Sequence, residues 1–138
     1  MKPMILAALF ALSIPTAAFA DATPSPKGAK VMILEPKAGA EIASPVTVKF
    51  GIEGMDIAPA GTDTPNTGHH HLIIDGKVDD MAAAIPADAT HVHFGKGQTE
   101  ATVELKPGKH TLQLVLGDKN HVPHNPPVTS EVISVTVK

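Results

Sequence analysis

The sequence predicts an all-β protein, an antiparallel immunoglobulin-like sandwich of about seven strands. Short apolar and β-branched segments follow one another along the chain, and proline and glycine residues separate them. Several of these segments also alternate apolar and polar residues with a period of two, which is typical of a strand buried on one face. Spacing and periodicity together favour a sandwich over a helical fold.

Seven segments fit this pattern: residues 30–35, 45–54, 69–75, 90–94, 99–105, 110–118 and 130–138. The first and fifth, KVMILE and TEATVEL, are short apolar or β-branched runs bounded by turn residues. The third and fourth, HHHLIID and THVHF, carry histidines. Alternation is cleanest in the second, sixth and seventh, whose predicted core residues are Val46, Val48, Phe50 and Ile52, then Leu112, Leu114 and Leu116, and finally Ile133, Val135 and Val137.

Two long connections interrupt the pattern. The proline-rich stretch between Gly54 and Gly68 is predicted to be a loop, and residues 79–89 contain the one expected helical turn, which Pro86 ends. Loops of this length in a compact domain are usually functional or mobile. Before the sixth strand, His110 follows a Pro-Gly turn where such sandwiches normally carry a tyrosine. We therefore expect the His110 ring to bond a nearby backbone group.

The chain divides into three predicted parts. Residues 1–20 have the pattern of a secretory signal peptide, with Lys2, an apolar run and small residues before the expected cleavage site. Residues 21–29 carry two prolines and are predicted to be a flexible tether, and residues 30–138 a single β-sandwich domain. The apolar run is too short to span a bilayer, so no membrane span is expected after cleavage. Export without any cysteine favours a bacterial periplasm or cell surface.

Composition excludes several kinds of partner and chemistry. Without Lys2 the chain has ten lysines and fourteen acidic residues and no arginine, so neither nucleic acid nor an anionic membrane is expected to bind. Beyond residue 20, Phe50 and Phe94 are the only aromatic residues, which are too few for a stacking surface. The absence of cysteine excludes thiolate metal sites and cysteine nucleophiles. Histidine remains as the main source of site chemistry.

Seven of the eight histidines fall in three separate segments, at 69–71, 91–93 and 121–124. Same-face histidines on a strand lie about 7 Å apart at the backbone, which lets both rings converge on one cation. The third segment follows the sixth strand, and in such a sandwich this connection lies at the end where the third strand begins. His70 points to the opposite, core-facing side. The predicted metal ligands are His69, His71, His91, His93, His121 and His124.

Imidazole without thiolate excludes a blue-copper centre and suits Cu(II), Zn(II) or Ni(II), of which Cu(II) is favoured by intrinsic affinity. Met55 and Met81 are candidate Cu(I) ligands, but packing is the preferred interpretation for both. Three carboxylates are candidates for orienting an imidazole from outside the coordination shell, although ordinary solvation at strand ends is the preferred interpretation for the two aspartates. They are Glu100, Asp75 and Asp118.

The segments HHHLIID, IPAD, HVHFGKGQTE, LKPGKHTLQLVLGD and HVPHNPPVTSE, from about residue 68 to the end, resemble a family of small exported bacterial domains of unknown function, DUF4399. The resemblance implies an exported single-domain β-protein whose histidine segments define the family, and it implies no activity. The earlier stretch LEPKAGAEIASPVTVKFGIEGM is similar to the first strands of periplasmic copper-carrier, cupredoxin-like sandwiches. That likeness concerns the fold alone, because those carriers begin with a metal-binding histidine and the expected mature terminus here is Asp21.

The leading functional hypothesis is a non-catalytic periplasmic protein that binds Cu(II) for storage, delivery or tolerance. Metal uptake is expected to weaken as the pH falls through the imidazole range, because a bound histidine must be neutral. The alternative is an interaction module in which the histidines form a structural hydrogen-bond network and the loop between Gly54 and Gly68 contacts another periplasmic protein. A metal-dependent enzyme ranks last, because no acidic residue is placed to act as a general base.

Overall fold

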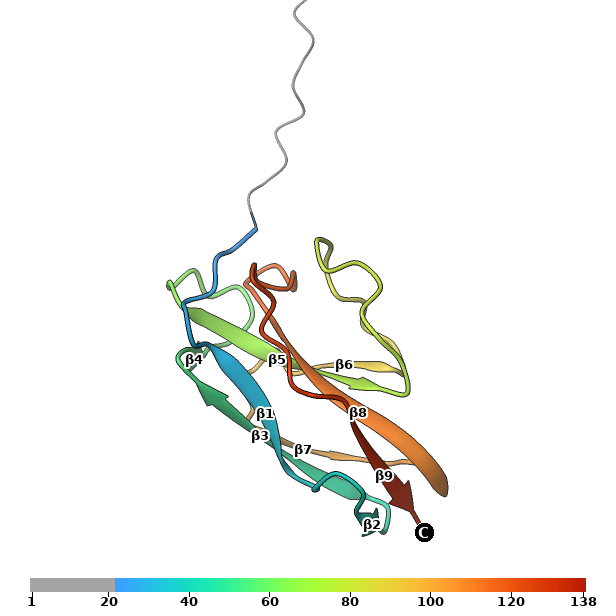
Figure 1. Cartoon of the computed structure of the whole chain (residues 1–138). Coiled ribbons are helices and arrows are strands. Elements are labelled where there is room, and N and C mark those ends of the chain that lie inside the picture. The colour runs from blue at the N-terminus through green and yellow to red at the C-terminus, as the bar shows by residue number, and fades with distance from the viewer. Residues whose placement is uncertain (1–21) are drawn as a thin grey trace, which may run out of the picture.

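The computed structural model describes residues 22–138, which form two β-sheets packed face to face (Figure 1). The smaller sheet has the strand order β1-β3-β7, with bounds Lys30–Glu35, Val46–Glu53 and Glu100–Val103. The larger sheet has the order β2-β9-β8-β5-β4, with bounds Glu41–Ile42, Ile133–Val137, Gly108–Gly117, Thr67–Ile74 and Asp56–Ile57. Strand β6, His91–His93, pairs with β5 beside this path.

The predicted all-β sandwich is confirmed, with nine strands in the described part of the chain instead of about seven. The two additional strands, β2 and β4, have two residues each and pair parallel to β9 and β5. Such short bridges carry no periodicity, so a pattern search does not find them. Within residues 22–138, no helix is long and apolar enough to cross a membrane.

The helical turn expected at residues 79–89 is wrong. The backbone makes a tight turn at residues 80–83, in which Ala83 N donates to Asp80 O over 3.3 Å and Ala82 N donates to Asp80 Oδ1 over 2.9 Å. An aspartate side chain that takes backbone donors competes with helix formation, and Pro86 prevents extension. The segment instead folds back over the larger sheet.

Residues 22–29, expected to be a flexible tether, are held against the loop that follows β8. Ser25 N donates to Asn125 O over 3.2 Å, Asn125 N donates to Thr23 O over 2.9 Å, and Ser25 Oγ donates to Pro126 O over 2.6 Å. These contacts satisfy backbone groups that composition alone assigned to solvent. The expected signal peptide, residues 1–20, and Asp21 lie outside the described residues.

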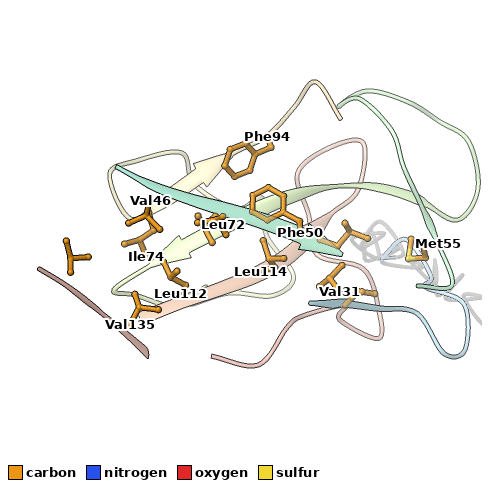
Figure 2. Close-up of a cluster of buried hydrophobic side chains, with 14 residues drawn as sticks. Val31, Val46, Phe50, Met55, Leu72, Ile74, Phe94, Leu112, Leu114 and Val135 are labelled. Carbon is orange, nitrogen blue, oxygen red and sulfur yellow. The ribbon is translucent and has the colours of Figure 1, made fainter. Parts of the chain in front are cut away.

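The main core lies between the two sheets (Figure 2). Every residue predicted to face it from β8 is buried, and the same holds for Val46, Val48 and Phe50 of β3. Strand β5 differs because residues 68–74 are all buried, on both faces. The second face is covered by the connection after β5, where Ile85 packs on Ile73 of β5 and Val115 of β8. The triple histidine therefore lies in the middle of the protein.

His70 is the histidine of β5 that enters the main core. Its side chain is fully buried, its ring centroid lies 4.9 Å from that of Phe50, and no group in residues 22–138 hydrogen-bonds either ring nitrogen. Burial lowers the pKa of His70 to about 4, so the ring is neutral. A neutral imidazole without partners is an energetic cost in this position.

Replacing His70 with leucine is expected to raise the free energy of unfolding by about 1–3 kcal/mol, because it removes the desolvation cost of two unpaired nitrogens. Denaturant unfolding of the metal-free protein measures the change. As a control for core packing, Leu72→Ala on the same face is expected to lower stability by about 2–5 kcal/mol. A His70→Leu variant less stable than the parent would contradict the prediction.

Candidate metal centre

Four imidazoles from three different segments converge on the covered face of the larger sheet. His69 and His71 project from β5, His93 from β6, and His121 from the loop after β8. The register explains the meeting, because His71 lies opposite His93 and His69 lies opposite Gly117, the last residue of β8. One nitrogen from each of the four rings lies within 4.8 Å of the others. These four residues are called the imidazole cluster below.

The rings of the imidazole cluster are arranged as an irregular tetrahedron. The six distances between ring centroids run from 4.5 Å for His93 and His121 to 5.9 Å for His71 and His121. Metal–nitrogen bonds of about 2.0–2.1 Å place the centroids of four tetrahedral imidazoles about 5 Å apart, whereas a square-planar set has two distances above about 6 Å. The spacing therefore fits one tetrahedrally bound ion with small adjustments.

The imidazole cluster depends on glycine at two neighbouring positions. A Cβ atom on Gly117 would lie 2.5 Å from Cε1 of His71, and one on Gly95 would lie 2.3 Å from Cε1 of His93. Both distances are below van der Waals contact, so each ring lies where a larger residue would place its side chain. Sequence reasoning assigned Gly95 to a hairpin turn and gave Gly117 no role. The available signal was the position of each glycine at a strand end, because Gly117 is the last residue of β8 and Gly95 follows β6 closely.

Asp118 shapes the loop that delivers His121. Its buried carboxylate accepts hydrogen bonds from Asn120 N at 2.8 Å and Val122 N at 3.0 Å through Oδ1, and from Thr23 Oγ1 at 2.7 Å through Oδ2. His121 itself has a φ of 66°, a left-handed conformation that non-glycine residues rarely adopt. Asp118, considered from the sequence as a possible orienting carboxylate, thus acts on the backbone of the loop, and Thr23 ties the N-terminal segment to it.

Burial keeps the strand imidazoles neutral. Desolvation, followed by the nearby His93 and His121 rings, lowers the pKa of His69 to about 4. Desolvation and the neighbouring imidazoles lower the pKa of His71 to about 3, and desolvation also lowers the pKa of His93. A metal ion binds only the neutral form of imidazole. The lowered pKa values therefore favour the ligating, neutral form of His69, His71 and His93.

The hydrogen bonding of the imidazole cluster is incomplete. His69 Nε2 and His121 Nδ1 lie 3.1 Å apart and share one hydrogen bond. Neither ring nitrogen of His71 has a hydrogen-bond partner within residues 22–138, although this side chain is only 1% exposed. Buried polar groups are normally paired, so an orphaned imidazole among three others requires an explanation. A metal ion would supply a partner for one of the two His71 nitrogens, which is the test of fit that these residues pass.

Two predicted ligands, His91 and His124, are not brought to the cluster. His91 lies two residues before His93 on β6, opposite Ile73 of β5. Its two ring nitrogens face Asp88 Oδ1 at 2.8 Å and Lys77 O at 2.9 Å. His124 is buried and turns its Nε2 to Thr67 O at 3.2 Å. Local acceptors hold both rings elsewhere, which a count of histidines per segment does not reveal.

His91 and His110 form a second electrostatic class. Although desolvation opposes protonation of His91, its bonds to Asp88 and Lys77 raise its pKa. The His110 ring hydrogen-bonds Asp75 Oδ2 at 2.6 Å and Lys106 O at 2.7 Å. The bond to Asp75 is the largest cause of its raised pKa. The backbone bond expected for His110 is confirmed. With acceptors on both nitrogens, these rings favour the charged form and are unsuited to bind a cation.

The comparisons with known proteins identify the family. Its model, described as "Domain of unknown function (DUF4399)", matches residues 48–138, more than half of the chain. The chain belongs to this family. All four residues of the imidazole cluster lie inside the part that DUF4399 covers, as do Gly95, Gly117 and Asp118. The predicted resemblance to DUF4399 is thereby confirmed, and it extends further toward the N-terminus than the histidine segments indicated.

No curated protein matches the chain significantly. A solved structure titled "Structures of Clostridium thermocellum CbhA fibronectin(III)-like modules" is similar to it at 14% sequence identity, covering 78% of this chain and 92% of that chain, with a TM-score of 0.36. A TM-score this low supports no inference about site or activity. The chemistry of this DUF4399 domain must therefore be inferred from its own residues.

Proposed function

We propose that the protein binds one transition-metal ion per chain through His69, His71, His93 and His121, and that it stores or delivers this ion outside the cytoplasm. The observation that carries the proposal is the convergence of four imidazole nitrogens within 4.8 Å of one another, with both nitrogens of the buried His71 unpartnered in residues 22–138. A purely structural histidine network would pair these nitrogens instead. Export is supported by the pattern of residues 1–20.

The proposed ion is Cu(II), with Zn(II) as the second candidate. An all-nitrogen site has its highest intrinsic affinity for Cu(II) among the divalent first-row metals. The near-tetrahedral spacing of the four ring centroids favours Zn(II), which takes that geometry without distortion, whereas Cu(II) prefers a tetragonal arrangement. Bound Cu(II) should consequently show a spectrum distorted from square-planar nitrogen coordination, and competition between the two ions measures which preference prevails.

The pH range of binding follows from burial. In a solvent-exposed site, protons displace the ion near the ordinary histidine pKa of about 6.5. Here burial lowers the pKa values of His69 and His71 to about 4 and about 3, so protons compete with the ion only in a more acidic range. The folded protein is therefore proposed to retain its ion at a mildly acidic pH.

The test is to measure metal binding by the untagged protein with calorimetry and elemental analysis. The parent is expected to bind one equivalent of Cu(II) or Zn(II), and the double variant His69→Ala/His71→Ala is expected to bind none at the same concentrations. The matched control is His91→Ala/His110→Ala, which removes two histidines outside the cluster and should keep the full stoichiometry. Equal affinity of the parent and the His69→Ala/His71→Ala variant would disprove the proposal.

A further inference from the structure

We propose that His93 is the exchangeable ligand of the imidazole cluster, and that the coordination position it leaves accepts a neutral imidazole from another molecule. The inference rests on the proposed function and concerns how the ion enters and leaves. The four ligands differ in exposure, in the segment that carries them and in the contacts that hold their rings.

Exposure separates His93 from the two ligands of β5. His69 and His71 are each 1% exposed, whereas His93 is exposed and His121 is half-buried. A ligand enclosed by protein has no solvent to receive its ring when the bond to the metal breaks. A ligand at the surface can rotate into water, which solvates its free nitrogen. The bond to His93 is therefore the one whose rupture costs least.

The local backbone also favours movement of His93. Strand β6 has three residues and pairs with β5 alone among the described strands. Its other edge carries an isolated bridge between Asp88 and His91, at the end of the strand away from His93. His93 is the last residue of this strand, and a turn with Gly95 and Gly97 follows. By contrast, His71 lies in the middle of β5, between β6 and β8. Short edge strands open locally at lower free energy than central strands.

The His93 ring lies in space that is open only because residue 95 is glycine. Its Cε1 occupies the space where a Cβ of Gly95 would be, at 2.3 Å, and no hydrogen bond in residues 22–138 fixes the ring. His121 is anchored differently, because its loop is tied by Asp118 and its carbonyl accepts a bond from Ile85 N at 2.8 Å. His93 is thus the least constrained member of the cluster.

The exchange involves no redox change. The bond between the metal and the His93 nitrogen breaks, and the ring keeps its lone pair and turns to solvent. An incoming imidazole nitrogen then donates its own lone pair to the same position, so coordination number and charge are conserved. Three protein imidazoles hold the ion throughout: His69, His71 and His121. An imidazole fits the exposed position because it reproduces the ligand that it replaces.

Two glycine variants test the inference. Neither Gly95 nor Gly117 has a positive φ, so alanine is compatible with the backbone at both positions and changes mainly the neighbouring ring. Gly95→Ala displaces His93, and Gly117→Ala displaces His71. Using Cu(II)-loaded protein and excess chelator, we expect Gly95→Ala to release the ion on the order of tenfold faster and to load faster. Gly117→Ala is expected to lose affinity on the order of 100-fold without faster loading.

Rescue with free imidazole supplies the second readout. In His93→Ala, millimolar imidazole is expected to restore the parental Cu(II) spectrum, whereas in His71→Ala, whose position is closed to solvent, it is not. Equal rescue of both variants, or a parental release rate in His93→Ala, would overturn the assignment of His93 while leaving metal binding intact. If the parent takes up neither Cu(II) nor Zn(II), the proposed function fails and this inference fails with it.

Discussion

Acidification from pH 6.5 to about 4 is expected to remove much of the stability of the metal-free protein. Burial lowers the pKa of His69 and His70 to about 4 and that of His71 to about 3, whereas the unfolded chain titrates near 6.5. In this window the unfolded state binds protons that the folded state refuses, so stability falls as the pH falls. One such histidine accounts for about 3 kcal/mol at pH 4, against roughly 5–15 kcal/mol for a whole domain.

Among the other groups with shifted pKa values, His93 adds to this trend and the rest do not. His91 and His110 have raised pKa values, so their contribution is fully present below pH 6.5 and is lost only as the pH rises through their folded pKa values. Their contribution is therefore nearly constant between pH 6.5 and 4, and it does not cause the loss. The pKa of Asp88 is lowered to about 2 and that of Asp118 is also lowered, so their stabilisation is lost only below about pH 4. The window between 4 and 6.5 therefore isolates the histidines whose pKa values are lowered.

Denaturant unfolding at several pH values between 7.5 and 4 measures this effect on chelator-treated protein. In the His70→Leu variant, one of the titrating rings is absent, so its loss of stability across the window should be smaller than that of the parent. Saturating metal should raise stability at each pH without flattening the dependence, because the ion-bound folded state excludes the same protons. Constant stability of the metal-free parent between pH 6.5 and 4 would contradict the assignment of these rings as neutral.

Replacing Asp118 with alanine is expected to lower the stability of the metal-free protein by about 2–4 kcal/mol and its metal affinity on the order of 10- to 100-fold. The change leaves the Asn120 and Val122 amides without their acceptor and releases Thr23. His121 then loses the loop conformation that directs its ring to the cluster. Thermal unfolding and Cu(II) titration measure the two effects separately.

Two further variants sharpen the Asp118 experiment. Asp118→Asn keeps one carbonyl oxygen for the loop amides, so its effect should be smaller than that of alanine. Asp63→Ala removes the exposed ion pair in which Lys119 Nζ lies 2.8 Å from Asp63 Oδ1, and should change stability by less than about 1 kcal/mol. If Asp118→Ala lowers stability while leaving metal affinity unchanged, the loop does not position His121.

The fold could be predicted from the sequence because its signal is local. All seven expected strands are present within a few residues of their predicted ends, since alternation along one strand reports which face is buried. The two-residue strands β2 and β4 and the turn at residues 79–89 were missed or misassigned because such elements are set by tertiary contacts. The covered second face of β5 was missed for the same reason, because the segment that covers it has no periodicity of its own.

The candidate site was only partly predictable. The pairing of His69 with His71 follows from the period of a strand, and the approach of a late loop follows from sandwich topology. The choice of His93 over His91 depends on register and on the acceptors Asp88 and Lys77 O, which no spacing reveals. The choice of His121 over His124 depends likewise on a loop shaped by a buried carboxylate.

By itself, the sequence determined an all-β chain that presents histidines in pairs on neighbouring strands. Side chains along an extended strand alternate between its two faces, so residues two apart point the same way. Only the tertiary structure decided which rings share a point in space and in which protonation state. That depends on burial, on glycines at 95 and 117 that leave room for the rings, and on the acceptors that pair His91 and His110 elsewhere. Those quantities arise between segments distant in sequence, where no local pattern carries them.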